Sequence, residues 1–234
     1  MNLESCFPFL TEKGHVISLV GGGGKTTLMY AMASCCARKG WKVLVTTTTH
    51  IMMPSGGVWA ESDATRDALW AGGNYTVAGS PAPGGKLATP PAQFLSRWMK
   101  LADLTLIEAD GAKRKPLKIP ADWEPVIPDF ADVVVSVIGL DCLGRPICET
   151  AHRAEYISSF LEKNLEAPVT PEDIEKIATS VHGLYKNVDH KVYRVYLNKA
   201  DVLPDPSPAE HIVEDLAKQG TIAAYGSLRE AEKI

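Results

Sequence analysis

Short apolar runs rich in β-branched residues recur along this chain and alternate with stretches of helical spacing. Residues 15–20 (HVISLV) and 42–49 (KVLVTTTT) have the pattern of buried strands. Between them, residues 26–40 carry apolar side chains at helical spacing and stop at Gly40. The order strand, glycine loop, helix, strand predicts a unit whose two strands are parallel.

The alternation continues towards the carboxyl end of the chain. Further strands are predicted at 74–79, 104–109, 131–140, 192–198 and 221–226, and helices at 63–72, 92–100, 151–165, 171–181 and 209–219. We expect Asp63 to cap the first of these helices and Thr170 to cap the fourth, with Asp173 completing that cap. Residues 109–128 have the composition of a loop.

These elements predict one domain over residues 1–234. Strands that alternate with helices, without a long linker, are typical of an α/β fold, in which a mostly parallel sheet has helices on both faces. Residues 54–91 interrupt the alternation because they hold three Gly-Gly pairs and five prolines. We therefore expect a loop-rich insertion there.

Charge and cysteine content restrict the kinds of partner. The formal net charge of −4 argues against electrostatically driven binding to nucleic acid or to an acidic membrane. Five cysteines without a C-x-x-C spacing indicate reduced thiols, and no apolar run approaches the roughly 18 residues that cross a bilayer. We therefore expect a cytoplasmic protein. Cys148 and His152, four residues apart, would share a helix face as half of a metal site, but two further ligands are not evident.

Four consecutive glycines separate the first predicted strand from the first helix. The motif consists of Gly21, Gly22, Gly23, Gly24, Lys25, Thr26 and Thr27. Consecutive glycines let several backbone N–H groups point inward at a helix amino terminus, which suits a phosphate chain. Lys25 would then reach the β- and γ-phosphates, and the Thr26 hydroxyl would ligate Mg²⁺. A flexible turn would explain the glycines but not the Lys-Thr-Thr that follows them.

A second motif follows the predicted strand 192–198. Asn198, Lys199 and Asp201 form an N-K-x-D tetrad, the guanine reader of GTPases. The Asp201 carboxylate would accept hydrogen bonds from guanine N1–H and N2–H₂, which adenine does not donate. The tetrad therefore predicts binding of GTP, while a simple Asn/Asp turn that begins a helix is the alternative.

Acidic residues stand where the strand 104–109 ends. Glu108 and Asp110 are placed where an NTPase holds Mg²⁺ through water and positions the attacking water. Asp141-x-x-Gly144, after the next strand, is a rival for this role. We expect Lys25, Glu108 and Asp110 to be catalytic, and Thr26 and Glu108 to hold the metal.

Two further groups are candidates for a switch or a substrate site. Thr49 and His50 end the second strand, near where a first switch would lie, although threonines are also good strand formers. Lys113, Arg114 and Lys118 follow the acidic residues directly. They predict either a solvated loop or a segment that binds an anionic substrate or partner.

Taken together, these segments resemble the YqeC family. The segments LVGGGGKTTLMYAMA, LIEADGAKRKPLKIPADWEPVIP and YLNKADVL carry the resemblance, which covers roughly residues 8–228. EADG followed by RKPLK is the most specific part, because generic P-loop proteins lack it. The glycine loop resembles those of SIMIBI-type P-loop NTPases, with Leu19 in place of the usual first glycine and Val20 in place of their extra signature lysine.

The resemblance implies a P-loop NTPase fold and a cytosolic protein that helps to mature the selenium-containing cofactor of certain molybdenum hydroxylases. We expect it to bind GTP with Mg²⁺, to hydrolyse GTP slowly, and to act on a selenium-dependent molybdenum hydroxylase or its maturation proteins. The alternatives are a small-molecule kinase that uses ATP or GTP and a nucleotide-bound carrier of a selenium or metal species. A homodimer is left open.

Overall fold

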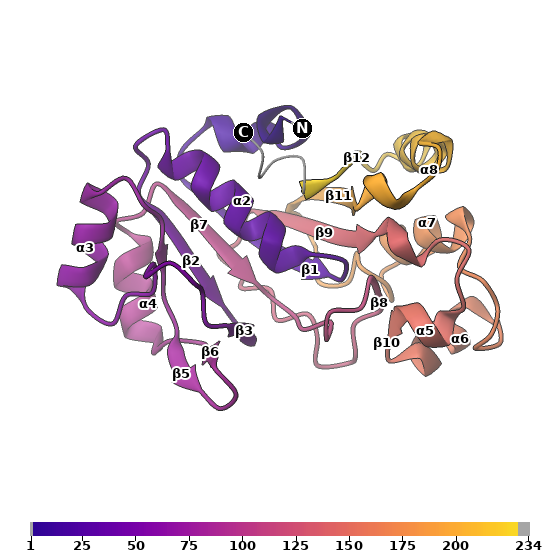
Figure 1. Cartoon of the computed structure of the whole chain (residues 1–234), viewed down its shortest axis with the longest axis horizontal. Coiled ribbons are helices and arrows are strands. Elements are labelled where there is room, and N and C mark those ends of the chain that lie inside the picture. Colours follow the sequence, from indigo (N-terminus) through magenta and orange to yellow (C-terminus); the bar gives the residue numbers. More distant parts are fainter. Residues whose placement is uncertain (1, 229–234) are drawn as a thin grey trace.

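The long apolar runs of the sequence form a seven-stranded parallel sheet (Figure 1). A computed structural model of the chain describes residues 2–228. The strand order is β12-β11-β9-β1-β7-β2-β4, and every neighbouring pair is parallel. The strands are β1 (His15–Gly21), β2 (Val43–Thr47), β4 (Thr76–Val77), β7 (Leu104–Glu108), β9 (Val133–Gly139), β11 (Val192–Asn198) and β12 (Ala223–Gly226).

Helices cover both faces of this sheet, as the sequence predicts. The helices are α1 (Leu3–Cys6), α2 (Lys25–Ala37), α3 (Asp63–Ala71), α4 (Ala92–Met99), α5 (Ile147–Thr150), α6 (Ala154–Leu161), α7 (Pro171–Thr179) and α8 (Ser207–Lys218). Alternate residues of β9 belong to separate buried clusters because side chains alternate along a strand. Val135 lies in the cluster that contains Met32 of α2, and Val134 in the cluster that contains Ile174 of α7.

The order of the strands decides where the glycine loop lies. β1 has β7 on one side and β9 on the other, and Glu108 at the end of β7 pairs with Leu19 of β1. On the other side, Asn198 at the end of β11 pairs with Gly139 at the end of β9. The carboxyl ends of four strands therefore meet at one edge of the sheet, where open α/β sheets bind their ligands.

Helix caps follow the sequence signals in one case and depart from them in another. Thr170 and Asp173 form the expected reciprocal cap of α7. The cap of α3 is Ser62 and not Asp63, which corrects the prediction: Ser62 has an extended backbone, and its hydroxyl accepts a hydrogen bond from the Thr65 N–H. The Asp63 carboxylate instead accepts bonds from Arg66 and from side chains of α4.

The region 54–91 contains more regular structure than its glycines and prolines predict. Besides α3 and β4, it contributes β5 (Ser80–Ala82) and β6 (Lys86–Ala88), which pair with β3 (His50–Met52) in a small antiparallel sheet. Each of these strands has three residues, too few for a periodic pattern to be recognised. Gly84 and Gly85, both with positive φ, make the turn between β5 and β6.

A second small sheet corrects the predicted helix at 151–165. Ala151–His152 (β10) is a strand that pairs with Leu117–Lys118 (β8), inside the segment expected to be a loop. Arg153 then takes a left-handed conformation with φ +57°, which separates β10 from α6. Cys148 on α5 and His152 on β10 therefore do not share a helix face. No helix within residues 2–228 has the length and apolar character needed to cross a membrane.

Candidate functional site

The glycine loop is a packed turn between β1 and α2. Gly23 and Gly24 have φ values of +71° and +120°, which residues with a side chain rarely adopt. A Cβ atom on Gly23 would collide with the backbone of Gly139, and one on Gly24 would collide with the Asn198 amide. The Gly23 N–H donates a 3.0 Å hydrogen bond to the Lys115 carbonyl. The glycines therefore serve close backbone approach, which a merely flexible turn would not require.

The amino end of α2 faces the same region. Its cap residue, Gly24, provides no side-chain hydrogen bond, so the N–H groups of the first helical turn depend on another partner. These groups and the helix dipole together attract an anion.

Lys25, the first residue of α2, is folded back beneath the loop. Its side chain is 4% exposed, and Nζ donates a 2.6 Å hydrogen bond to the Gly21 carbonyl. Nζ also lies 3.1 Å from Oδ1 of Asp110 and 3.9 Å from Oε1 of Glu108. Burial by itself lowers the pKa of Lys25, but these two carboxylates more than offset it and hold the pKa above its usual value. The ammonium group is therefore charged at neutral pH.

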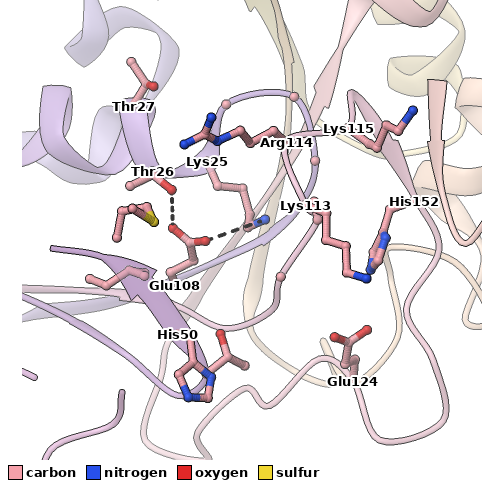
Figure 2. Close-up of a pocket in the computed structure, with 18 of the residues that line it drawn as sticks. Lys25, Thr26, Thr27, His50, Glu108, Lys113, Arg114, Lys115, Glu124 and His152 are labelled. Carbon is pink, nitrogen blue, oxygen red and sulfur yellow. Dashed lines mark hydrogen bonds and ion pairs between the residues drawn. The ribbon is translucent and has the colours of Figure 1, made fainter. Parts of the chain in front are cut away.

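Thr26 and Glu108 join α2 to the end of β7. The Thr26 hydroxyl donates a 2.6 Å hydrogen bond to Oε2 of Glu108 (Figure 2). Burial raises the pKa of Glu108, against the opposing effects of Lys25 and of the Thr26 hydrogen bond. Mg²⁺ in nucleotide sites is held by one or two protein oxygen ligands together with phosphates and water. The Thr26 hydroxyl and the Glu108 carboxylate fit that requirement.

Asp110 lies behind the loop, where neither its side chain nor that of Lys118 is exposed. Its Oδ2 accepts a 3.0 Å hydrogen bond from the Gly21 N–H, and the Nζ of Lys118 lies 3.0 Å from the same oxygen. Its other oxygen pairs with Lys25. Asp110 is therefore placed to hold the loop, Lys25 and Lys118 in position.

A cavity of about 700 Å³ opens in front of the loop and Glu108 (Figure 2). Of the residues singled out from the sequence, it is lined by Gly22, Gly23, Gly24, Lys25, Thr26, Thr27, Thr49, His50, Glu108, Lys113, Arg114 and Lys199. Gly21, Asp110, Lys118, Asn198 and Asp201 are outside its lining. The lining includes seven basic side chains and two acidic ones, although the whole chain has a net charge of −4. The cavity is therefore strongly cationic.

Among the lining residues that the sequence did not assign to this site are Glu124, His152 and Arg153. Glu124 accepts a 2.6 Å hydrogen bond from Nη1 of Arg153 and lies 2.9 Å from Nζ of Lys118. Burial raises the pKa of Glu124, but the bonds from Arg153 and Lys118 outweigh it and hold the pKa at about 2. Nothing in the sequence around Glu124 signals this role, because Arg153 is 29 positions away.

His152 is a buried, uncharged histidine in this cationic surrounding. Burial, followed by the charges of Arg153 and Lys118, lowers its pKa to about 4. The imidazole is therefore neutral at pH 7 and offers one hydrogen-bond donor and one acceptor. Within residues 2–228, it forms no side-chain hydrogen bond with another residue.

Comparison with known proteins decides the family of the chain. The model of the family described as "YqeC protein" matches residues 17–155, more than half of the sequence. The chain belongs to the YqeC family. It is 33% identical over 230 residues to the uncharacterized protein YqeC of Escherichia coli (strain K12), covering 94% of this chain and 90% of that protein.

The stretch that matches the YqeC model contains most of the cavity. It spans the glycine loop, Glu108 and the basic run (residues 113–118), and it extends to Glu124 and Arg153. Asn198 and the rest of the tetrad lie beyond it.

The tetrad of this YqeC family member is attached to the loop through its asparagine. The Asn198 Nδ2 group donates a 2.7 Å hydrogen bond to the Gly23 carbonyl. Lys199 lines the cavity and pairs with Asp141 at 2.6 Å, so the rival carboxylate is engaged with this lysine. Asp201 is exposed and lies in the turn Ala200–Val202, two positions after Lys199 in the sequence.

The shared helix face that would have made Cys148 and His152 half of a metal site does not form. Cys148 donates to Oε1 of Glu166 at 3.5 Å, and His152 turns into the cavity. In the described part of the chain, no group of three or more His, Cys, Asp or Glu residues is arranged to hold a metal ion.

Proposed function

We propose that this YqeC family protein is a P-loop NTPase that binds GTP with Mg²⁺ and hydrolyses it slowly. The observation that carries the proposal is the 2.6 Å hydrogen bond from the Thr26 hydroxyl to Glu108, beside the buried Lys25 and the glycine loop. A hydroxyl, a carboxylate, a lysine and a helix amino end converge on one cationic cavity. This set has the chemistry to bind a nucleoside triphosphate and its metal.

Each group has a distinct task in the proposed reaction. The N–H groups at the start of α2 and the Lys25 ammonium group hold the phosphate chain, for which Lys25 turns from the Gly21 carbonyl towards the ligand. The Thr26 hydroxyl and Glu108 would hold Mg²⁺, which would supply positive charge to neutralise the charge that develops on the phosphate oxygens.

Glu108 also positions the attacking water. The water oxygen forms a bond to the γ-phosphorus while the bond to the β-phosphate oxygen breaks, so the products are GDP and inorganic phosphate. The proton of the water passes to the released phosphate.

The positions of two tetrad residues support guanine as the base of the bound nucleotide. Asn198 ties the tetrad to the phosphate loop through the Gly23 carbonyl, and Lys199 lines the cavity. The tetrad therefore begins at the same edge of the sheet as the proposed phosphate site. In the proposal, the Asp201 carboxylate accepts the guanine N1–H and N2–H₂ hydrogen bonds.

The deciding experiment compares GTP with ATP by calorimetric titration, with and without Mg²⁺. We expect GTP to bind more tightly than ATP, and Mg²⁺ to strengthen binding. Lys25→Ala should abolish binding, with the exposed Lys218→Ala as the matched control; retained binding in Lys25→Ala would refute the proposal. Release of free phosphate supports hydrolysis, whereas phosphate on an added compound would favour the phosphotransferase alternative.

The cellular role that we propose rests on the family resemblance. It is assistance in the maturation of a selenium-dependent molybdenum hydroxylase, coupled to the nucleotide cycle. The test is the selenium content and activity of the hydroxylase in cells that lack this protein, with rescue by the wild type but not by Lys25→Ala. Full hydroxylase activity without the protein would exclude the role.

A further inference from the structure

The cationic cavity has more positive charge than a nucleotide at the glycine loop would use. Lys86, Lys113 and Arg114 line it and form no ion pair with another residue in the range 2–228. Mg²⁺ cancels part of the charge of a bound triphosphate, and Lys25 already stands at the loop. A site for a nucleotide alone therefore leaves several lysines and arginines without an anionic partner.

Backbone strain is concentrated at the same residues. Seven non-glycine residues in the described part of the chain have positive φ, and four of them line this cavity: Lys113, Arg114, Arg153 and Lys199. All four are basic, and none belongs to the asparagine or aspartate types that accept this conformation most easily. Strained residues of this kind cluster at ligand sites because the surrounding structure must hold them there.

Lys113, His152 and Glu124 lie together on one side of the cavity. In Figure 2, the Lys113 side chain lies next to His152, and the Glu124 carboxylate faces the same space. Their proximity also appears in the lowered pKa of His152, to which burial contributes most and Lys113 contributes as well. Thr26 and Glu108, the proposed metal-binding pair, lie on the other side of Lys25 from this group in the same view.

Arg153 is held in position for a ligand. Its guanidinium donates one hydrogen bond to Glu124 and lies 5.4 Å from the ring centroid of Trp123. A guanidinium has five N–H donors, so most remain available. The Glu124 carboxylate is already paired with both Arg153 and Lys118, and within residues 2–228 the Lys113 ammonium group forms no ion pair with any carboxylate.

We propose that the cavity binds a second ligand beside the nucleotide, a small molecule with a phosphate or carboxylate group. Arg153 and Lys113 bind its oxyanion, and the neutral His152 forms a hydrogen bond to it. The assignment of the rest of the cavity to a nucleotide rests on the proposed function, but the oxyanion subsite stands on these residues alone.

The experiment is a calorimetric titration of inorganic phosphate into the full chain saturated with Mg²⁺ and a non-hydrolysable GTP analogue. A parallel titration uses malonate, so that the two arms distinguish phosphate from carboxylate chemistry. We expect one of the two to bind in a one-to-one ratio. Arg153→Gln and Lys113→Gln should each weaken that binding by about tenfold or more, and change binding of the analogue by less than about twofold.

Matched variants separate loss of the subsite from loss of structure. Lys113 is exposed, so Lys113→Gln removes its charge without breaking an ion pair of the described part of the chain. Arg145→Gln is the control, because Arg145 is exposed, pairs with Glu149 and does not line the cavity. It should bind phosphate or malonate like the wild type.

The outcomes distinguish this inference from the proposed function. Lys25→Ala without nucleotide should still bind the oxyanion; if it does not, the glycine loop is the anion site and the second subsite is refuted. If the analogue binds but neither phosphate nor malonate does, the inference fails and the proposed function stands. If GTP does not bind but Arg153-dependent oxyanion binding persists, the proposed function fails and the inference stands.

Discussion

Lys118 and Asp110 form an ion pair of 3.0 Å in which neither side chain is exposed. The pair lies at the centre of a row of side chains with alternating charge. On one side, Oδ1 of Asp110 lies 3.1 Å from Nζ of Lys25. On the other side, Lys118 also pairs with Glu124, which in turn pairs with Arg153. The proposed phosphate-binding lysine and the proposed oxyanion-binding arginine are thus connected through buried ionic contacts.

Replacement of the central lysine should destabilise the fold. Lys118→Met removes a partner from two buried carboxylates, Asp110 and Glu124, and breaking a buried pair typically costs about 3–5 kcal/mol. We expect a loss of that order in the free energy of unfolding, measured by urea denaturation. Lys218→Met is the control: its pair with Asp215 is exposed, and its loss should be below about 1 kcal/mol. A similar small loss for Lys118→Met would contradict the structural role.

Thr26 should determine the dependence of nucleotide binding on Mg²⁺. Thr26→Val keeps the shape of the side chain but removes the hydroxyl that binds Glu108, whereas Thr26→Ser keeps the hydroxyl. We expect the gain in GTP-analogue affinity on adding Mg²⁺ to fall by about tenfold in the valine variant and to persist in the serine variant. Titrations with and without Mg²⁺ check this. Equal gains in both variants would remove Thr26 from the metal site.

Asp201 should determine the preference for guanine. Asp201→Ala removes the acceptor proposed for the two guanine donors, and a lost hydrogen bond to a charged group costs about 1.5–3 kcal/mol. The ratio of GTP to ATP affinity should therefore fall by about tenfold or more, while ATP binding changes little. Competition titrations of both nucleotides measure the ratio. An unchanged ratio would assign base selection to other residues.

His152 should make the protein less stable in mild acid. Its pKa is about 4 in the folded chain, because of its burial and of the charges of Arg153 and Lys118, against 6.5 as the ordinary value. Between these two values the unfolded chain binds more protons than the folded one, so the free energy of unfolding rises as the pH increases from 4 to 6.5.

A variant without a titrating ring tests this contribution. His152→Gln should show a smaller rise in the free energy of unfolding between about pH 4.5 and about pH 7 than the wild type. Urea denaturation at both pH values gives the difference. His182→Gln, at an exposed position, is the control and should follow the wild type. A rise as steep in His152→Gln as in the wild type would assign the acid sensitivity to other groups.

The sequence predicts the centre of the fold because the central strands are long apolar runs. Their parallel order places Glu108 beside the glycine loop, where its carboxylate accepts the hydrogen bond from Thr26. The small sheets could not be predicted in the same way. Strands of two or three residues, such as Lys86–Ala88 and Ala151–His152, carry no measurable periodicity, and their backbone pairing depends on tertiary contacts.

The part of the site around Glu124 could not be predicted for a different reason. Its geometry depends on side chains that are distant in sequence, since Glu124 meets Arg153 and Lys118 only after β8 and β10 pair. The sequence of residues 151–165 predicts a helix from its first residue, but the left-handed Arg153 and the β10 strand override that local pattern. Local propensity is a weak guide where tertiary pairing decides the backbone.

The backbone of the basic run is also part of the support of the glycine loop. The Lys115 carbonyl accepts the Gly23 N–H, and the Pro116 carbonyl accepts the Gly139 N–H, each at 3.0 Å. The Lys115 side chain can therefore vary without moving the loop, whereas inserting or deleting a single residue would shift the carbonyls on which the loop rests. Among relatives of this chain, we expect the number of residues between Glu108 and Pro116 to be constant even where Lys115 is replaced.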